Sequence, residues 1–506
     1  MMSDISTTEN SLYNPLLSHS AANTASQFLE RILERTKDIL HVLAPRVLAN
    51  LLSTIGNAYL YGRLSGLSPR EDYSAATGLI SLVRLVLIII PSGFFYIVPV
   101  SWRNAEDAKK PMVVTNALAV AVSFGLLGSG ASLSSHYFFR SIGVDSSVCD
   151  IIEEYFNMYA PVFPIHLMAI VFNQAAHCLD AHRLLLVDGL LNVVFLFAFS
   201  SFFLKEHLLA IFSSTQIVAL SSLLSAVSRF SVYSVSYAVR GDVFEPIKDI
   251  ISRDHRRGFV SLIKEGVTVC LQLGAESIGS FMVSILVTLM LQQQKMDLSI
   301  LNVMNQFFTF SIVIPIALGV TALNKVLDAK KSNQLDLIDS YVNICLGLAV
   351  FYNIVLILVV MSMPTTFANF FMNPSDNEHK GLSGSFRAIF AITCVGILFD
   401  SFKNIINMSF RGLKHYRLGL EVSVFGVLIG LSLAALLGYF LGMAGMLLGF
   451  NTCNIFMGSC MLHYWFKKQS IDEQSSLWAD VKGLLFKASR ESWEFPSHPS
   501  CISELG

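Results

Sequence analysis

The sequence has little charge. Only 14% of its 506 residues are Asp, Glu, Lys or Arg, and 53% are hydrophobic, whereas soluble domains have about 25% charged residues. The mean hydropathy of +0.59 excludes an ordinary soluble domain and predicts an integral membrane protein. The net charge of -1 leaves no excess of positive charge for binding nucleic acid or another polyanion.

The signatures of catalysis are also missing. The eight cysteines include no C-x-x-C pair, and no histidines cluster at metal-ligand spacing. The chain has neither a nucleotide-binding loop nor a nucleophile with its base. We therefore expect a protein that is not an enzyme and needs no cofactor. We expect no cleavable signal peptide, because the start of the chain is polar and contains acids.

What the sequence does contain is a series of long hydrophobic segments. Each is close to or above the length of about 20 apolar residues that crosses a bilayer as a helix. Since every spanning backbone must satisfy its own hydrogen bonds, helices rather than open strands are expected. The sequence predicts an all-α integral membrane protein with about twelve spans, at residues 42–65, 76–101, 112–135, 156–178, 184–204, 209–238, 260–291, 299–323, 340–364, 386–409, 418–440 and 443–465.

More polar segments divide the chain into five parts. Residues up to about 26 are rich in Ser, Thr and Asn and have little to bury, so we expect a disordered tail there. Residues 27–40 place apolar and charged residues at helical spacing, which fits an amphipathic helix on the membrane or a solvated helical extension. The predicted parts are an N-terminal cytoplasmic tail (1–40), a six-helix lobe (41–239), a cytoplasmic linker (240–259), a second six-helix lobe (260–467) and a C-terminal cytoplasmic tail (468–506).

Basic residues gather in alternate loops between the predicted spans. The positive-inside rule places these loops in the cytoplasm, so both termini are expected there and Asp145–Glu154 outside. We expect a multi-pass protein of a plasma or inner membrane. The basic residues of the even-numbered loops are Arg103, Lys109, Lys110, Arg183, Arg240, Lys248, Arg253, Arg256, Arg257, Lys325, Lys330, Lys331, Arg411, Lys414 and Arg417.

The two halves of the chain resemble each other. The segment IIIPSGFFYIVPVSWRNAEDAKK of the second span is similar to IVIPIALGVTALNKVLDAKK of the eighth, and Phe172-Asn173 matches Phe399-Asp400. Parallel repeats of this kind place a substrate cavity between two lobes. Pro315 is expected to bend or interrupt the eighth span, because proline removes a backbone hydrogen bond. Pro91 is the corresponding hinge or gate candidate in the second span.

Two acids lie inside predicted spans, Glu276 in the seventh and Asp400 in the tenth. A carboxylate at membrane depth is unfavourable by several kcal/mol, so such residues face a bundle interior or a wet cavity. Lys403 is three residues after Asp400 on the same helical face. If Lys403 points inward, it could neutralise Asp400 as a structural ion pair.

The order of Gly266, Glu276, Asn305, Pro315 and Gly319 resembles the seventh and eighth helices of the multidrug and toxin extrusion (MATE) family of transporters. The ending LNKVLDAKK departs from the glycine-containing loop that is usual there. The Arg411-Gly412 pair after Asp400 also matches the tenth helix of that family. The resemblance implies that Glu276 and Asp400 bind the coupling cation, either Na⁺ or H⁺.

The resemblance also marks polar residues in the first lobe. Asn57 stands where first helices of the family usually have Asp, and an amide cannot carry a proton at ordinary pH. Asn192 resembles a cation-site Asn, and Asp188 one turn earlier might supply the missing carboxylate or be solvated at a helix end. Asn173 is a further candidate, although an interhelical hydrogen bond is the simpler role. Arg229 is expected to pair with an acid or to extend toward the membrane surface.

These residues predict a monomeric MATE-like secondary antiporter that exports organic compounds in exchange for Na⁺ or H⁺. The 38 phenylalanines suit a cavity for amphipathic cations, or simply packing against lipid. One alternative is a lipid-linked flippase of the wider superfamily, which would need more inward cationic residues than the sequence suggests. Another is a transport-dead receptor or scaffold, given Asn57 and Lys403.

The predicted topology can be tested with tags. We expect a tag at either terminus to be accessible only from the cytoplasm, and a tag inserted at Asp145–Ser147 only from outside. Selective permeabilisation followed by antibody labelling measures this. Termini on opposite faces of the membrane would contradict the count of twelve spans.

Overall fold

A computed structural model describes residues 14–65, 67, 70–179, 181–202, 212–240, 253–291, 294–362 and 382–467. Among these residues the regular elements are all helical. The α-helices are α1 (Asn14–Ser65), α2 (Arg70–Phe95), α3 (Val98–Asn104), α4 (Lys110–Ser141), α5 (Ser146–Tyr159), α6 (Val162–Cys178), α7 (His182–Phe202), α8 (Ser214–Arg240), α9 (Arg253–Met290), α10 (Gln294–Ser311), α11 (Val313–Lys331), α12 (Asp336–Ser362), α14 (Leu382–Gly412) and α15 (Tyr416–Lys467).

These helices confirm the predicted all-α membrane fold. In the described part of the chain, nine segments are long and apolar enough to cross a membrane, and the bent pair α5 and α6 adds a tenth. The helix α7 has 21 residues, and the 52-residue α15 folds back on itself. Counting α7 and both arms of α15 gives the twelve predicted spans.

The fold in α15 lies at Gly442. This residue has φ 62° and ψ −143°, a combination that is accessible mainly to glycine. Beyond it, the chain returns along the first arm, and a Cβ on Gly445 would lie 2.1 Å from the Leu437 carbonyl oxygen. The sequence placed the boundary between the last two spans at this point.

The eighth span is interrupted at Ile312, between α10 and α11. Pro315 has no N–H, so it cannot donate to the Ser311 carbonyl four residues earlier. The Tyr352 hydroxyl donates to that carbonyl oxygen instead, at 2.9 Å. A side chain of α12 therefore compensates the hydrogen bond that the proline removes.

The corresponding break in the second span is displaced from Pro91. Pro91 lies inside the continuous helix α2, and the break between α2 and α3 comes at Tyr96 and Ile97. Pro99 follows this break as Pro315 follows the break at Ile312. Both hinges thus lie just before a proline, and in the second span that proline is Pro99.

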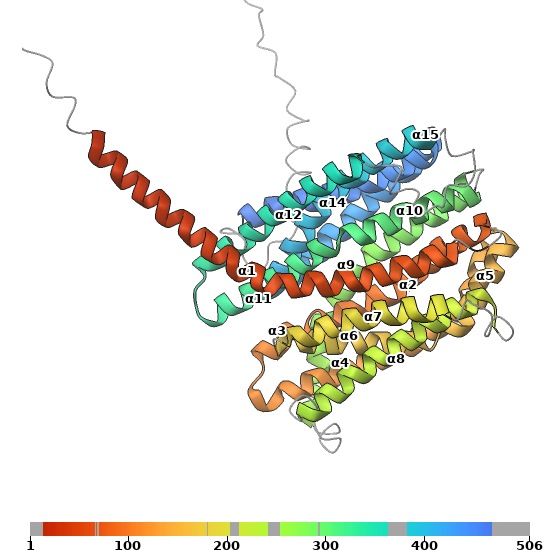
Figure 1. The fold of residues 1–506 in the computed structure, drawn as a ribbon, viewed down its shortest axis with the longest axis horizontal. Coiled ribbons are helices and arrows are strands. Elements are labelled where there is room, and N and C mark those ends of the chain that lie inside the picture. The colour runs from red at the N-terminus through yellow and green to blue at the C-terminus, as the bar shows by residue number, and fades with distance from the viewer. Residues whose placement is uncertain are drawn as a thin grey trace, which may run out of the picture.

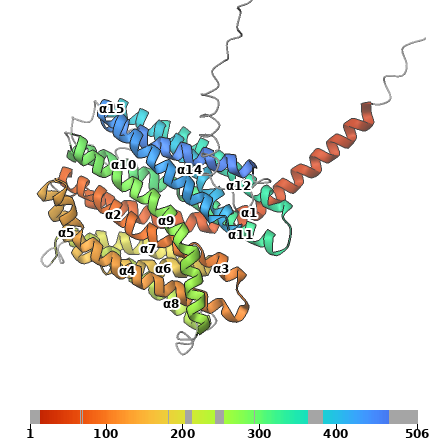
Figure 2. The same cartoon turned by 180° about the vertical axis from the view of Figure 1, so that it is seen from behind.

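The helices form two groups that lie side by side, α1–α8 and α9–α15 (Figure 1). The first helix of each group crosses to the other group at one end. Ile39 and Leu43 of α1 belong to the core of the second group. Conversely, Leu262 and Val269 of α9 belong to the core of the first group. The view from behind shows α9 passing between the groups (Figure 2).

The two groups are in contact at both ends of the bundle. At the predicted extracellular end, one hydrophobic core includes side chains of both groups, and a Cβ on Gly78 of α2 would lie 3.2 Å from the Asn302 Cβ of α10. At the predicted cytoplasmic end, Val100 packs with Val320, Leu323, Leu327 and Met408. Arg103 forms an ion pair with Asp328 there.

The predicted tails and linker fall partly outside the described residues. The chain is helical from Asn14 onward, and α1 continues without interruption to Ser65. Residues 27–40 therefore extend the first span, and this helix projects beyond the bundle (Figure 1). Residues 241–252 of the linker and 468–506 of the C-terminal tail lie outside the described residues.

The close contact of α2 with α9 gives a stability prediction. A Cβ on Gly93 would lie 2.5 Å from the Cys270 Cα, so Gly93→Ala must push the two helices apart. We expect the free energy of unfolding to fall by about 1–3 kcal/mol, as for other overpacked sites. Thermal unfolding in detergent measures the loss.

Gly62→Ala is the matched control, because a Cβ on Gly62 meets nothing within 4 Å. We expect this variant to be as stable as the parent or slightly more stable, since alanine favours a helix over glycine. Equal melting temperatures for the two variants would contradict the close packing at Gly93.

Candidate functional site

Three charged side chains meet inside the second lobe. The Lys403 ammonium lies 2.8 Å from Glu276 Oε2 and 2.6 Å from Asp400 Oδ1. Lys403 and Asp400 are each 3% exposed, and Glu276 is partly buried. The two predicted cation-coupling acids are therefore brought together by one lysine, and we call these three residues the acidic triad.

Three helices build the acidic triad. Spacing of i and i+3 places Asp400 and Lys403 on one face of α14, and α9 brings Glu276 to the same ammonium. Ser423 of α15 donates a hydrogen bond to Glu276 Oε1 at 2.6 Å, and Asn404 donates to Asp400 Oδ2 at 2.7 Å. Each of the four carboxylate oxygens of the triad therefore accepts a hydrogen bond from an ammonium, a hydroxyl or an amide.

A second buried cation lies beside the triad. The Arg411 guanidinium donates to Gln272 Oε1 at 3.2 Å and lies over the Tyr96 ring at 5.6 Å. Arg411 is 3% exposed and interacts electrostatically with Glu276. Since it contacts neutral partners, it adds positive charge near the triad without binding either carboxylate directly.

Carboxylate and hydroxyl oxygens are suitable ligands for Na⁺, since hard cations prefer oxygen ligands. Glu276 and Asp400 of the triad offer carboxylate oxygens, and the neighbouring Ser423 offers a hydroxyl. However, the described residues contain no group of three or more His, Cys, Asp and Glu that could hold a metal ion. Na⁺ at this site would share the two carboxylates with the Lys403 ammonium.

Two pairs of polar side chains connect α7 and α8 in the first lobe. Arg229 of α8 binds both oxygens of Asp188 of α7, at 2.6 and 2.9 Å. One turn along, Ser225 of α8 donates to Asn192 Oδ1 at 2.7 Å. Asp188 is 5% exposed, so it is paired with Arg229 rather than solvated at a helix end.

The predicted asparagines of this lobe meet at a backbone carbonyl. The side-chain amides of Asn57 and Asn192 each donate to the Ser53 carbonyl oxygen at 3.1 Å. Asn173 lies elsewhere, where it donates to the Tyr233 hydroxyl at 3.2 Å and links α6 to α8. Asn57 and Asn192 thus share one acceptor, while Asp188 and Asn173 have other partners.

Arg84 of α2 is a further buried cation, 7% exposed, that is not among the residues predicted from the sequence. Its guanidinium donates to the Tyr61 hydroxyl at 2.6 Å. Its position inside a long apolar run, like that of Arg229, could have identified it from the sequence. With Arg46, Lys403 and Arg411 it makes four buried lysine and arginine side chains among the described residues, more than the sequence suggested.

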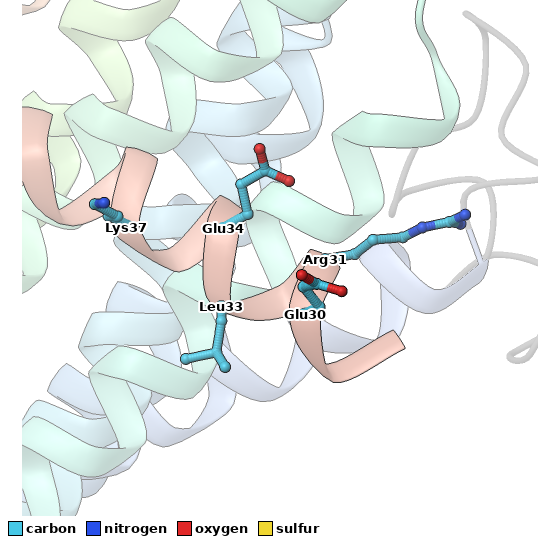
Figure 3. A pocket seen from close by; sticks show the side chains of 5 residues that line it. All are labelled: Glu30, Arg31, Leu33, Glu34 and Lys37. Carbon is cyan, nitrogen blue, oxygen red and sulfur yellow. The ribbon is translucent and has the colours of Figure 1, made fainter. Parts of the chain in front are cut away.

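A surface hollow lies on the projecting part of α1 (Figure 3). Both acidic and basic side chains line it, so it has no marked preference for a charged ligand. It lies outside the helix bundle and away from the polar clusters described above. Its lining residues are Glu30, Arg31, Leu33, Glu34 and Lys37.

Comparison with known proteins identifies a domain in the second half of the chain. Residues 269–436 match the family model MatE. This range contains Glu276, Asp400 and Lys403, and so the complete acidic triad. No curated protein matches the sequence.

Solved structures share the fold over most of the chain. An outward-facing multidrug resistance MATE family transporter of the MOP superfamily aligns with a TM-score of 0.71 and 16% identity, covering 87% of this chain and 97% of that one. The eukaryotic MATE transporter AtDTX14 aligns with a TM-score of 0.72 and 13% identity, covering 88% of this chain and 97% of that one. A mutant of the MATE transporter VcmN of Vibrio cholerae aligns with a TM-score of 0.66 and 16% identity, covering 87% of this chain and 99% of that one.

The acidic triad gives a second stability prediction. Lys403→Met removes the cation between two buried carboxylates, and loss of one partner of a buried ion pair costs roughly 3–5 kcal/mol. Restoring electrical balance with Glu276→Gln and Asp400→Asn in the same protein is expected to recover most of that loss. Unfolding in detergent measures each variant.

Lys110→Met is the matched control, because Lys110 pairs with the exposed Asp107 and exposed pairs contribute little. We expect its stability to stay close to that of the parent. If Lys403→Met were as stable as Lys110→Met, the ammonium would not be required by the two acids.

Proposed function

We propose that the chain is a MATE-type, cation-coupled secondary antiporter, because residues 269–436 match the MatE family model and the chain has the fold of MATE transporters. It exchanges Na⁺ or H⁺ entering the cell for an organic compound leaving it. MATE family members are transporters rather than enzymes. The proposal therefore concerns what drives transport and what is carried.

The charge of the acidic triad carries this proposal. Glu276 and Asp400 supply two negative charges, and Lys403 supplies one positive charge. One unit of negative charge remains inside a membrane-spanning bundle, where uncompensated charge is costly. One monovalent cation, a proton or Na⁺, neutralises it. Arg411 reduces the deficit from a distance, but its direct contacts are with neutral groups.

Coupling requires that cation binding favour one arrangement of the lobes over another. The triad is suited to this, because Glu276 lies on α9, which packs with the first lobe along its earlier half. Asp400 and Lys403 lie on α14 of the second lobe. A change in the charge of the triad therefore acts on the helix that joins the lobes.

The same proposal includes the setting of the transporter. We propose that both termini are cytoplasmic, as the distribution of basic loops predicts, and that the protein works as a monomer in a plasma or inner membrane. The hydrophobic exterior places it in a lipid bilayer as a multi-pass protein. Its partners are then lipid and small organic molecules.

The exported compound has two candidate classes. The aromatic content of the sequence suggests amphipathic organic cations. The four buried basic residues favour instead an anionic substrate, including the lipid-linked compounds that flippases of this superfamily carry. Lys403 and Arg411 lie beside acids, so the preference for an anion depends mainly on the first lobe.

The coupling role is tested by Glu276→Gln, which preserves shape but cannot cycle charge. We expect substrate efflux driven by a Na⁺ or proton gradient in reconstituted vesicles to fall to the level of empty vesicles. Asp150→Asn is the control, because Asp150 is an exposed acid paired with Arg140, and it is expected to transport like the parent.

Three outcomes are informative. If Glu276→Gln transports at the parental rate across pH and Na⁺ concentration, the carboxylate is structural and the coupling proposal fails. Efflux that no gradient accelerates favours a flippase with another energy source. A parental protein that binds compounds but moves none under any gradient favours a receptor or scaffold.

A further inference from the structure

Arg84 lies in an aromatic cage inside the first lobe. Its Nη1 lies 2.6 Å from the Tyr61 hydroxyl and 3.4 Å from the Tyr155 hydroxyl. The guanidinium carbon is 4.5 Å from the centre of the Tyr159 ring and 5.2 Å from that of Tyr61. Three helices, α1, α2 and α5, therefore meet at this one cation.

Arg84 lacks the carboxylate partner that two other cations inside the bundle have. Arg229 is paired with Asp188, and Lys403 with Asp400 and Glu276. Among the residues that the structure describes, no carboxylate forms an ion pair with Arg84, and the side chains in direct contact with its guanidinium include three tyrosines. Ring faces attract a cation, but they carry no net negative charge.

One hydrogen-bonding group in the cage is unused. The Arg84 Nε has no direct hydrogen-bond partner among the described residues, whereas the hydroxyl of the fully buried Tyr159 interacts with the Arg84 guanidinium. Buried polar groups are normally satisfied, so each unsatisfied group calls for an explanation. This N–H can donate, and no carboxylate in the cage accepts from it.

The surroundings extend this positive region. His166 of α6 interacts electrostatically with both Arg84 and Arg229, so it lies between the cage and the Asp188–Arg229 pair. Two arginines and one aspartate leave an excess of one positive charge in this part of the lobe. The second lobe has the opposite imbalance at its acidic triad.

We propose that Arg84, Tyr61, Tyr155 and Tyr159 bind the anionic group of an organic substrate, a carboxylate or a sulfonate on an aromatic body. Guanidinium groups bind such planar anions through paired hydrogen bonds, and the tyrosine rings provide faces for an aromatic body. The inference deepens the proposed transport function by naming the substrate class. Binding itself needs no gradient and can be tested separately.

The cage is closed in this structure. Tyr155 and Tyr159 are 0% exposed and belong to the hydrophobic core that both lobes share at the predicted extracellular end. A ligand can reach Arg84 only when this core opens. Anion binding is then expected to favour the conformation in which the lobes are separated at that end.

The experiment uses three probes that share one ring system and differ in charge: 1-naphthoate, 1-naphthamide and 1-naphthylmethylammonium. Equilibrium binding of labelled 1-naphthoate to the purified full chain, with the others as competitors, ranks their affinities without a gradient. We expect 1-naphthoate to bind at least about tenfold more tightly than either analogue, because it alone carries a negative charge to pair with the guanidinium. Parental protein that prefers the amide or the ammonium would overturn the proposal.

Variants then assign the preference to the cage. Arg84→Gln is expected to weaken 1-naphthoate binding by roughly 10- to 100-fold, the range for a lost charged hydrogen bond, with little effect on 1-naphthamide. Arg84→Lys is expected to retain part of the affinity because it keeps the charge. Arg140→Gln is the control, because Arg140 is an exposed arginine paired with Asp150. Unchanged affinity in Arg84→Gln, or an equal loss for all three probes, would show a structural role and overturn the proposal.

Two further measurements cover other outcomes. If Arg84→Gln does not fold, Tyr159→Phe removes a single hydroxyl of the cage, and we expect a selective loss of 1-naphthoate affinity. Replacing buffer chloride by gluconate separates organic from inorganic anions. Stabilisation by chloride with none by 1-naphthoate would mean an inorganic anion site and would overturn the proposal. Failure of cation-driven efflux with the probe ranking intact would leave this site standing and reject only the coupling.

Discussion

The sharing of Lys403 by Glu276 and Asp400 is the interaction on which the second lobe depends. Three charges lie within hydrogen-bonding distance inside a membrane protein, so removal of any one leaves the others without balance. The same contact connects α9 to α14, and through α9 the second lobe to the first. Stability and coupling therefore depend on the same atoms, so both the free energy of unfolding and the transport activity must be measured for each variant of the triad.

The crossing of α1 and α9 gives this connection its geometry. Each begins in the core of the opposite lobe and continues into the core that both lobes share. A rigid rocking of two separate lobes does not suit such helices, because either crossing helix would have to leave one core. The breaks before Pro99 and Pro315 lie in α2–α3 and α10–α11, and we propose that bending there would open one end while the other stays packed. The acidic triad in the second lobe and the arginine cage in the first then lie on either side of this moving region.

The sequence was informative wherever the physics is local. Hydrophobic length predicted the spans, proline predicted the break in the eighth span, and acids inside apolar runs identified Glu276 and Asp400. Partners across helices were not predictable, because they depend on how far apart α9 and α14 pack. The spacing along α14 indicates that Lys403 can pair with Asp400, but its contact with Glu276 joins two different helices and has no such local signal. Arg84 carried the same local signal as Arg229, yet only the structure reveals that one has a carboxylate and the other has tyrosines.

The most direct test of the account is the number of monovalent cations that the purified protein binds. Titration with radioactive Na⁺ at fixed pH, with protons released into weakly buffered solution recorded at the same time, counts both candidate ions. The excess of one negative charge at the acidic triad predicts one cation per chain, either Na⁺ or a proton displaced by it, and none when Glu276 is replaced by Gln. A parental protein that binds neither ion, or a variant that binds them as the parent does, would contradict the account.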